Sequence, residues 1–280
     1  MKVVFCTVVY PQAWKWHREF AEALNKQKYN DFELLIVNDG VESHDVDAFC
    51  KLLNYKCKVI NIQQKLTISQ IRIEMLKTAK DDGIDLAILG DFDDLFDEYR
   101  VQEIIAGYDS KYSFFYHDLK TESGEIVFTE LPEQVNDVNQ IMEENFLGLS
   151  NTAINLDAFE QEFFHTLKNV NTNVFDWYLY AKILASDRNG KRIYNAYTIY
   201  RQQENNIAGA YQQKSENLGK EISIKLEQYR LLADDLPVAG YLYDIYSRLQ
   251  RCGLNEQRKY LNHQFKGYWW SNLKIIKEEK

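Results

Sequence analysis

The sequence predicts an α/β fold in which helices flank a mostly parallel sheet, with a helical appendage at the C-terminus. Over about the first hundred residues, short apolar runs alternate with amphipathic stretches, which is the pattern of βαβ units. From about residue 215 onward the composition is helical, and few glycines or prolines interrupt it. We therefore expect a main domain over residues 1–212, with halves at 1–110 and 111–212, and a helical extension over residues 213–280.

Length and composition restrict the class of protein. The chain has 280 residues, of which 45% are hydrophobic and 14% aromatic, so it can bury a large core. It carries 33 Lys and Arg residues against 42 Asp and Glu, and the net charge of −9 argues against a nucleic-acid binder. The 4 cysteines form no CxxC pair, and no apolar run approaches the roughly 20 residues of a membrane-spanning helix. We therefore expect a cytoplasmic protein.

Apolar runs that end at polar or turn-forming residues predict the strands of the first half. These strands are expected at residues 2–8, 32–37, 58–62 and 85–90. Apolar side chains recur at helical spacing between them, which predicts helices at residues 13–25, 45–55 and 67–80. The fourth strand is of the fully buried type found in parallel sheets.

Beyond residue 110 the pattern is less regular. Strands are expected at residues 111–117, 125–129, 152–156 and 191–200, and helices near 157–168 and 174–186. We expect this half to adapt the fold to a particular substrate.

Polar residues that follow the predicted strands are the first candidates for a ligand site, because parallel sheets bind ligands at the carboxyl ends of their strands. Asp91, Asp93 and Asp94 directly follow the most buried strand of an acidic chain, so a divalent cation is the expected partner. Carboxylate oxygens suit Mn²⁺ or Mg²⁺. Alternation along an extended turn directs Asp91 and Asp93 to one side and Asp94 to the other. The alternative is a solvated loop that caps the helix beginning near Asp97.

Taken in order, the motifs resemble glycosyltransferase family 2. They are an opening strand, Asn38-Asp39-Gly40, the acidic Asp91-Phe92-Asp93-Asp94, Asp176-Trp177, and Tyr200-Arg201 followed by Asn205, Asn206 and Gly209. The resemblance covers roughly residues 1–210. It implies a GT-A fold whose residues 1–110 bind a nucleotide and whose residues 111–212 bind an acceptor. It also implies transfer of a sugar from a nucleoside diphosphate, UDP by expectation, to a saccharide or lipid-linked acceptor with inversion, as in surface polysaccharide or glycolipid assembly.

The resemblance also assigns roles on the donor side. Thr7 and Tyr10 match positions that contact the base, Asp39 matches the carboxylate for a uracil-type base, Arg72 lies near the nucleotide, Asp91 belongs to the ribose and metal motif, and Arg201 faces the diphosphate. The metal falls to Asp93 or Asp94, and the motif does not decide between them. The local sequences depart from the family at Thr-Val-Val-Tyr-Pro, at Val41 and at Gln203. For Arg72, an ordinary exposed helix arginine is the alternative.

Asp176 matches the general base that takes the proton of the acceptor hydroxyl in that family. Phe175 stands where the family commonly has Glu. The alternative is that Asp176 caps the N-terminus of the following helix. The segment from Asn145 to Asn151 is expected to shape the acceptor side.

The C-terminal tail is basic and aromatic. Residues 248–280 hold 8 Lys and Arg against 3 Glu, and Tyr268, Trp269 and Trp270 lie among them. This pattern suits a helix that lies on an anionic membrane, which would place the protein on the inner face of the cell membrane. The alternative is a helix whose aromatic side chains pack on the main domain or on a second subunit of a homo-oligomer.

Other classes of function compete with the transferase. The segment from Leu89 to Phe96 also resembles the nucleophile loop of haloacid-dehalogenase-like phosphatases, with Asp91 as nucleophile. Against this, Leu95 replaces the usual Thr or Val, and βα units precede the motif. A binding protein for nucleotide-sugars that has lost turnover is the non-enzymatic alternative. The histidines show no metal-ligand spacing.

Overall fold

The computed structural model describes residues 1–167, 170–201 and 218–276. These fall into two compact units whose segments alternate along the chain. Unit 1 comprises Met1–Ile126, Leu149–Asn171 and Gly190–Arg201, and unit 2 comprises Val127–Gly148, Thr172–Asn189 and Gln202–Lys280. The expected boundary at residue 212 lies outside the described residues.

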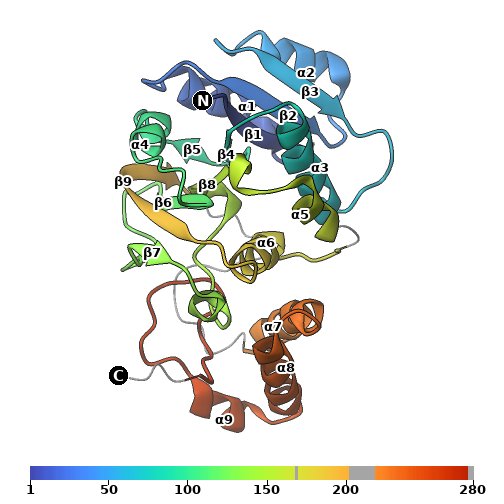
Figure 1. Ribbon diagram of the computed structural model, residues 1–280, viewed down its shortest axis with the longest axis vertical. Coiled ribbons are helices and arrows are strands. Elements are labelled where there is room, and N and C mark those ends of the chain that lie inside the picture. The colour runs from blue at the N-terminus through green and yellow to red at the C-terminus, as the bar shows by residue number, and fades with distance from the viewer. Residues whose placement is uncertain (168–169, 202–217, 277–280) are drawn as a thin grey trace. The chain divides into compact units, whose positions relative to one another are not determined.

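Unit 1 is built on a mixed sheet with the strand order β3-β2-β1-β4-β8-β6-β9-β5 (Figure 1). Its strands are β1 (Val3–Val9), β2 (Glu33–Asn38), β3 (Cys57–Asn61), β4 (Leu86–Leu89), β5 (Leu95–Phe96), β6 (Phe114–Lys120), β8 (Thr152–Asn155) and β9 (Gly190–Ile199). Strands β1 to β4 run parallel, as the βαβ pattern predicts. Strand β8 runs antiparallel to both β4 and β6, and β5 runs antiparallel to β9. The α/β prediction is therefore confirmed.

Helices of unit 1 follow the predicted order with shifted ends. They are α1 (His17–Asn25), α2 (Ser43–Cys50), α3 (Ile68–Asp81), α4 (Arg100–Ala106) and α5 (Gln161–Thr166). Helix α3 begins after Thr67, which forms a capping box with Gln70. The expected helix at 13–25 opens with a 3₁₀ turn, Trp14–Trp16, and the one at 45–55 ends at Cys50.

The strand expected at residues 125–129 does not form. Only an isolated bridge joins Lys120 to Ile126, and the Ile126 side chain is 46% exposed. Phe128 packs instead on Trp269 of unit 2, with ring centroids 5.0 Å apart. Burial of an aromatic ring therefore outweighs strand propensity here.

An aromatic core fixes the turn that follows β4. Phe92 is fully buried, and its ring lies 4.7 Å from Phe20 and 5.4 Å from Phe49 between centroids. Trp14 stacks on the same ring at 5.8 Å. Because Phe92 points into this core, its sequence neighbours on both sides are held toward the edge of the sheet.

Unit 2 combines helices with irregular chain. Its helices are α6 (Phe175–Leu184), α7 (Leu218–Leu232), α8 (Pro237–Gln250) and α9 (Leu254–Gln257), and it also holds the short strand β7 (Gln134–Val135). The expected helical appendage is confirmed by α7, α8 and α9, but it is not helical throughout, because residues 261–276 form an irregular segment. We call residues 261–276 the C-terminal segment.

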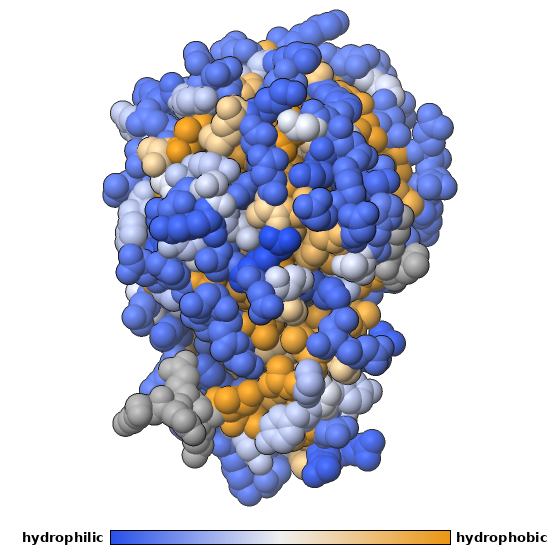
Figure 2. Space-filling model, in the orientation of Figure 1, coloured by the Kyte–Doolittle hydropathy of each residue, from blue (hydrophilic) through white to orange (hydrophobic). Residues whose placement is uncertain are grey.

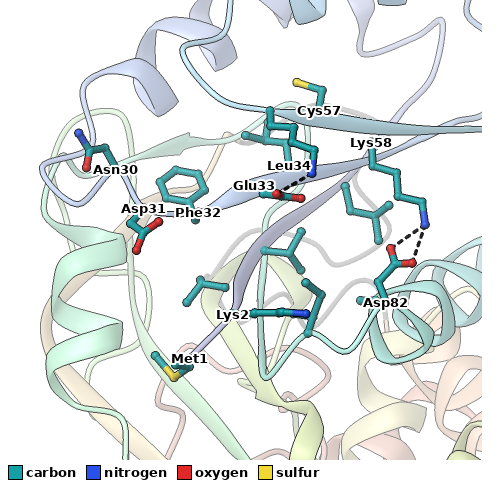
Figure 3. A pocket seen from close by; sticks show the side chains of 16 residues that line it. Met1, Lys2, Asn30, Asp31, Phe32, Glu33, Leu34, Cys57, Lys58 and Asp82 are labelled. Carbon is teal, nitrogen blue, oxygen red and sulfur yellow. Dashed lines mark hydrogen bonds and ion pairs between the residues drawn. The ribbon is translucent and has the colours of Figure 1, made fainter.

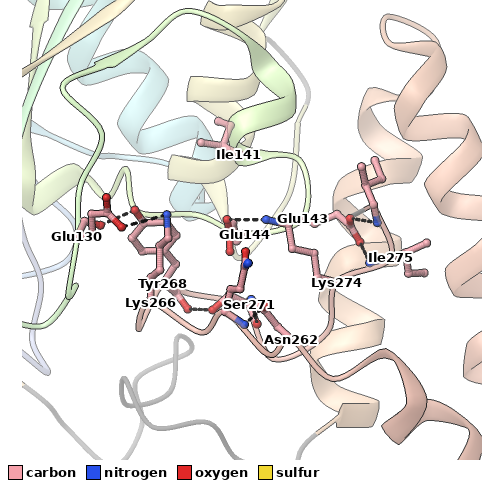
Figure 4. Close-up of polar contacts among 12 residues, drawn as sticks. Glu130, Ile141, Glu143, Glu144, Asn262, Lys266, Tyr268, Ser271, Lys274 and Ile275 are labelled. Atoms are coloured by element: carbon pink, nitrogen blue, oxygen red, sulfur yellow. Dashed lines mark hydrogen bonds and ion pairs between the residues drawn. The ribbon is translucent and has the colours of Figure 1, made fainter. Parts of the chain in front are cut away.

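Buried polar contacts fix the C-terminal segment within unit 2. Trp269 and Asn145 exchange backbone hydrogen bonds of 2.8 and 2.9 Å, and the Glu143 carboxylate accepts from the N–H of Ile275 (Figure 4). Lys274 pairs with Glu144 at 3.2 Å.

The aromatic residues of the tail are buried. Tyr268, Trp269 and Trp270 are only 5–9% exposed. The burial of these rings within unit 2 contradicts a helix that turns them toward a membrane surface. It bears out the alternative that the aromatic side chains pack within the protein, although the segment that carries them is not a helix. Among the described residues, no helix is long and apolar enough to cross a bilayer. Figure 2 shows a face on which hydrophilic side chains predominate, with hydrophobic areas between them.

Candidate active site

Strand order brings the predicted donor residues to one edge of the sheet. Neighbouring strands β2, β1 and β4 end beside Asp39, Tyr10 and Asp91 respectively. Since these strands are parallel, their carboxyl ends face the same way. Residues that are far apart in the sequence therefore converge, as the βαβ pattern predicts.

The acidic turn after β4 shows the expected alternation. Asp91 and Asp93 keep part of their surface exposed, whereas Asp94 is only 2% exposed. The backbone N–H of Asp91 donates to the Ser150 hydroxyl at 3.3 Å. Asp94 does not cap the following helix, because α4 begins at Arg100 after Tyr99. The cap alternative therefore lacks support at this turn.

Crowding of these carboxyl groups changes their protonation. Burial and the neighbouring Asp91 charge raise the pKa of Asp93 to about 6, while Arg201 and Arg72 oppose the shift. Burial, followed by the charges of Asp93 and Asp91, raises the pKa of Asp94 well above its ordinary value. Such a cluster carries its full negative charge at neutral pH only when positive charge lies nearby.

Two arginines supply positive charge to the turn. Arg72 of α3 donates from Nη2 to Asp91 Oδ1 at 3.2 Å, and its side chain is 23% exposed. Arg72 is therefore a partly buried arginine that pairs with the acidic turn. Arg201 donates its backbone N–H to Asp94 Oδ1 at 2.9 Å. Both arginines belong to the same cluster as the carboxylates.

The Arg201 guanidinium is already engaged on the protein. It lies over the Trp16 ring at 3.9 Å from the centroid and pairs with Glu19 and Glu122. The sequence predicted that this guanidinium faces a diphosphate, and it predicted neither Glu19 nor Glu122 as a partner. The glycine-containing stretch that follows Arg201 lies outside the described residues.

The base side of the site combines a buried hydroxyl with a phenol. Thr7 is 1% exposed, and its hydroxyl makes no hydrogen bond among the described residues. Burial, followed by the charges of Asp93 and Asp91, raises the pKa of Tyr10. Asp39 donates its backbone N–H to Val9 at 2.8 Å, and its side chain is partly exposed. Tyr10 and Asp39 therefore keep part of their surface exposed at this edge, whereas the Thr7 hydroxyl is buried.

Asp176 belongs to unit 2 and lies in the first turn of α6. The N-cap of α6 is Val174, so Asp176 does not cap this helix and that alternative is wrong. Its carboxylate accepts from the N–H of Trp177 at 2.8 Å and keeps part of its surface exposed. Trp177 is fully buried and donates its indole N–H to the Ile141 carbonyl at 2.5 Å. The buried tryptophan therefore fixes the backbone that carries Asp176.

The segment expected on the acceptor side divides between the units. Asn145 is buried in unit 2, where its amide braces Leu147. Ser150 and Asn151 belong to unit 1. The Ser150 hydroxyl accepts from the N–H of Asp91 in the carboxylate turn, and Asn151 donates to the His117 carbonyl at 3.0 Å.

Sequence reasoning also missed a buried arginine. Arg100 is fully buried below the carboxylate turn, where it contacts His117. An arginine at the start of a helix usually lies at the surface, so its sequence context gave no signal.

The residues present fit a divalent cation only in part. Within the described residues, no group of three or more His, Cys, Asp and Glu is arranged to hold a metal. Mg²⁺ and similar ions, however, commonly use one or two carboxylates together with substrate phosphates. Asp94 Oδ2 is buried and makes no hydrogen bond among the described residues, which fits a second ligand beside Asp93.

A separate cavity of about 790 Å³ lies at the opposite ends of the strands (Figure 3). Lys2, Glu33, Lys58 and Asp82 are among the residues that line it. Lys58 already pairs with Asp82 at 2.6 Å. Because the cavity is formed where the parallel strands begin, it does not belong to the ligand edge of the sheet.

Comparisons with known proteins give the family of the chain and the proteins that share its fold. The model of the family described as "Glycosyl transferase family 2" matches residues 5–171. No curated protein sequence matches the chain.

Several solved structures share the fold at low sequence identity. A fragment of S. aureus TarS in complex with UDP-GlcNAc has a TM-score of 0.56 and 16% identity, over 92% of this chain and 78% of that one. The mannosyltransferase PcManGT from Pyrobaculum calidifontis, in complex with GDP-Man and Mn²⁺, has a TM-score of 0.56 and 9% identity, over 90% and 70% of the chains. GalNAc-T7 with UDP, GalNAc and Mn²⁺ has a TM-score of 0.55 and 12% identity, over 83% and 48%.

Proposed function

Because the chain belongs to glycosyl transferase family 2 and is a glycosyltransferase, we propose that it moves a sugar from a UDP-sugar to an acceptor hydroxyl with inversion. The observation that carries this proposal is the acidic turn at the carboxyl end of β4, where part-exposed Asp91 and Asp93 lie beside Arg72. The acceptor is a saccharide or a lipid-linked saccharide in this proposal. Family membership leaves the phosphatase alternative without support.

In this proposal the donor nucleotide binds along the edge formed by β2, β1 and β4. Thr7, Tyr10 and Asp39 contact the base, and Asp91 accepts from the ribose hydroxyls. Arg72 orients the Asp91 carboxylate, since it donates to Oδ1 and leaves Oδ2 for the ligand. The fold shared with TarS, which binds UDP-GlcNAc, supports a uridine nucleotide.

Asp93 and Asp94 would hold the divalent cation, Mn²⁺ or Mg²⁺. When bound, such an ion acts as a Lewis acid that stabilises the charge on a leaving diphosphate. The buried Asp94 Oδ2, which makes no hydrogen bond among the described residues, supports this assignment, because a cation would give this oxygen a partner and favour the ionised carboxylate. The Mn²⁺ in the structures of PcManGT and GalNAc-T7 supports it as well.

Asp176 is the proposed general base. Its carboxylate takes the proton from the acceptor hydroxyl while that oxygen attacks the anomeric carbon. The bond between the anomeric carbon and the phosphate oxygen breaks, and its electron pair leaves with UDP. Attack from the face opposite to the leaving group inverts the anomeric configuration. A partly exposed carboxylate on a fixed helix suits this role.

Calorimetric titration of UDP in the presence of Mn²⁺ tests the donor site. We expect binding that a chelator abolishes and that Asp93→Ala weakens by about 10-fold or more. GDP should bind more weakly than UDP if Asp39 reads a uracil-type base. Absence of nucleoside diphosphate binding by the folded wild-type protein, with or without Mn²⁺, would refute the proposed donor.

A further inference from the structure

Arg100 is an arginine in an unusual position. It is the first residue of α4 and is fully buried. Its guanidinium lies beside two aromatic rings that contact each other, 5.4 Å from the Phe5 centroid and 4.8 Å from the Phe96 centroid. A buried cation on aromatic faces is a costly arrangement that needs compensation by hydrogen bonds.

The guanidinium hydrogen bonds connect separate parts of the sheet edge. Nη2 donates to the Leu89 carbonyl at 2.5 Å and to the Ser150 carbonyl at 3.2 Å, and Nε donates to His117 Nε2 at 2.9 Å. Among the described residues, none of these partners is a carboxylate, and the buried Nη1 atom makes no hydrogen bond. Asp91 and Asp94 act on Arg100 only through the electric field, which opposes the effect of burial on its pKa. Arg100 therefore brings positive charge near the acidic turn and leaves the carboxylate oxygens for a ligand.

Both carbonyl partners of Arg100 lie beside the acidic turn. Leu89 ends β4 two residues before Asp91, and Ser150 is the residue whose hydroxyl accepts the Asp91 N–H. Thr198 of β9 donates its hydroxyl to the same Ser150 carbonyl at 2.7 Å. Arg100 therefore connects the strand that carries the turn to the segment that supports it.

Packing leaves this arrangement little freedom. A Cβ atom at Gly90 would lie 2.5 Å from Phe5 and 2.7 Å from Phe96, the same rings that lie beside Arg100. A shift of Arg100 would therefore move those rings against the backbone of the turn.

His117 fixes the third side of the guanidinium. Because arginine can only donate, His117 Nε2 must accept, so the ring is neutral and its proton lies on Nδ1. Nδ1 is 3.0 Å from the Asp118 carbonyl, which completes this tautomer. Burial, followed by the charge of Arg100, lowers the pKa of His117 well below its ordinary value.

We propose that Arg100, oriented by neutral His117, is a positioning residue that holds the Asp91–Asp94 turn in the geometry that binds the metal and the nucleotide diphosphate. This inference rests on the proposed function. Arg100 touches neither ligand and acts through the Leu89 and Ser150 carbonyls.

The test measures ligand affinity in folded variants. Mn²⁺ alone is followed by the loss of its free-ion paramagnetic resonance signal, and UDP with Mn²⁺ is followed by calorimetry. Arg100→Met should weaken both by about 10- to 100-fold, as other residues that orient metal ligands do. Arg100→Lys keeps one donor and should recover part of that affinity. His117→Gln keeps an acceptor near Nε2 and should stay closer to the wild type than His117→Leu.

A matched control separates positioning from general stability. Leu34 is fully buried in β2, and Leu34→Ala should lower the melting temperature without changing affinity below that temperature. Wild-type affinity in folded Arg100→Lys, His117→Gln and His117→Leu alike would overturn the inference. An affinity loss in Leu34→Ala as large as that in Arg100→Met would overturn it too. Failure of the wild type to bind UDP or Mn²⁺ would instead refute the proposed function on which the inference rests.

Discussion

At the scale of single residues, Gly90 shows why the acidic turn needs its particular sequence. The position between β4 and Asp91 has no room for a side chain, because the rings of Phe5 and Phe96 lie against it. Gly90→Ala should lower the free energy of unfolding by about 1–3 kcal/mol through overpacking. Thermal denaturation measures this loss.

Gly240 in α8 is the matched control for that substitution. Nothing lies within 4 Å of a Cβ atom built there, so Gly240→Ala should stabilise the protein by about 0.5–1 kcal/mol through helix propensity. A Gly90→Ala protein as stable as the wild type would contradict the packing described here.

His117 makes the free energy of unfolding depend on pH. The folded state holds its pKa well below the ordinary value of 6.5, so the unfolded state binds more protons as the pH falls through 6.5. The stability contributed by neutral His117 is therefore present above pH 6.5 and is lost below it. Between pH 7.5 and 5.5 the wild type should lose about 1 kcal/mol more than His117→Gln.

Urea unfolding at several pH values measures this difference. Substitution of exposed His44 by Gln provides the control, since its side chain is 80% exposed and should not change the pH profile. Parallel profiles for the wild type and His117→Gln would show that His117 titrates freely in the folded protein.

The sequence is most informative about single residues where polar side chains directly follow a strand. Alternation of apolar and polar side chains after β4 explains why Asp91 and Asp93 keep part of their surface exposed, and Arg72 joins Asp91 from helix α3. Arg100 and the partners of the Arg201 guanidinium were not predictable. Their contacts join positions far apart in the chain, and the local sequence does not show which distant residues pair.

At the scale of elements, the same distinction separates the first half of the chain from the second. Strands β1 to β4 and helix α3 form close to their predicted positions, since each has a regular apolar period and clear end signals. The expected strand at 125–129 and the expected helix in the tail do not form. Phe128 and Trp269 pack on each other there, and long-range burial of aromatic rings overrides local propensity.

The C-terminal segment is predicted to be essential for the stability of unit 2. Glu143 is 3% exposed and accepts from the Tyr246 hydroxyl at 2.7 Å and from the N–H of Ile275 at 2.8 Å. Glu143→Leu leaves these donors without an acceptor, which should cost about 1–3 kcal/mol for each buried group. Thermal denaturation together with limited proteolysis of the C-terminal segment measures the effect.

Glu130 offers a surface comparison for Glu143. Its side chain is 70% exposed and pairs with Lys266 at 3.3 Å, so Glu130→Gln should change stability by no more than about 1 kcal/mol. Equal stability of the Glu143→Leu and Glu130→Gln proteins would refute the structural role of the buried carboxylate.

At the scale of the whole molecule, the proposed function assigns donor binding and proton transfer to different residues. Unit 1 contains the residues assigned to the nucleotide and the metal, and unit 2 contains Asp176. Loss of the base should therefore leave donor binding intact. Asp176→Asn keeps the size of the side chain and its oxygen acceptor for the Trp177 N–H, but it cannot take a proton.

Asp176→Asn should bind UDP and Mn²⁺ with an affinity within about two-fold of the wild type. A change of this size is smaller than the affinity loss that removal of one binding contact produces. Its release of UDP from a UDP-sugar should fall by about 10²- to 10⁴-fold, the usual contribution of a general base. Asp235→Asn is the matched control. Asp235 is an exposed carboxylate that pairs with Lys182, and Lys182 lies on α6 together with Asp176. Turnover by Asp176→Asn at the wild-type rate would exclude Asp176 as the base. A loss of UDP affinity as large as that of Asp93→Ala would show instead that Asp176 acts in donor binding. The two carboxylates are therefore distinguished by measuring affinity and turnover in each variant: a donor-binding residue changes affinity, and a general base changes turnover alone.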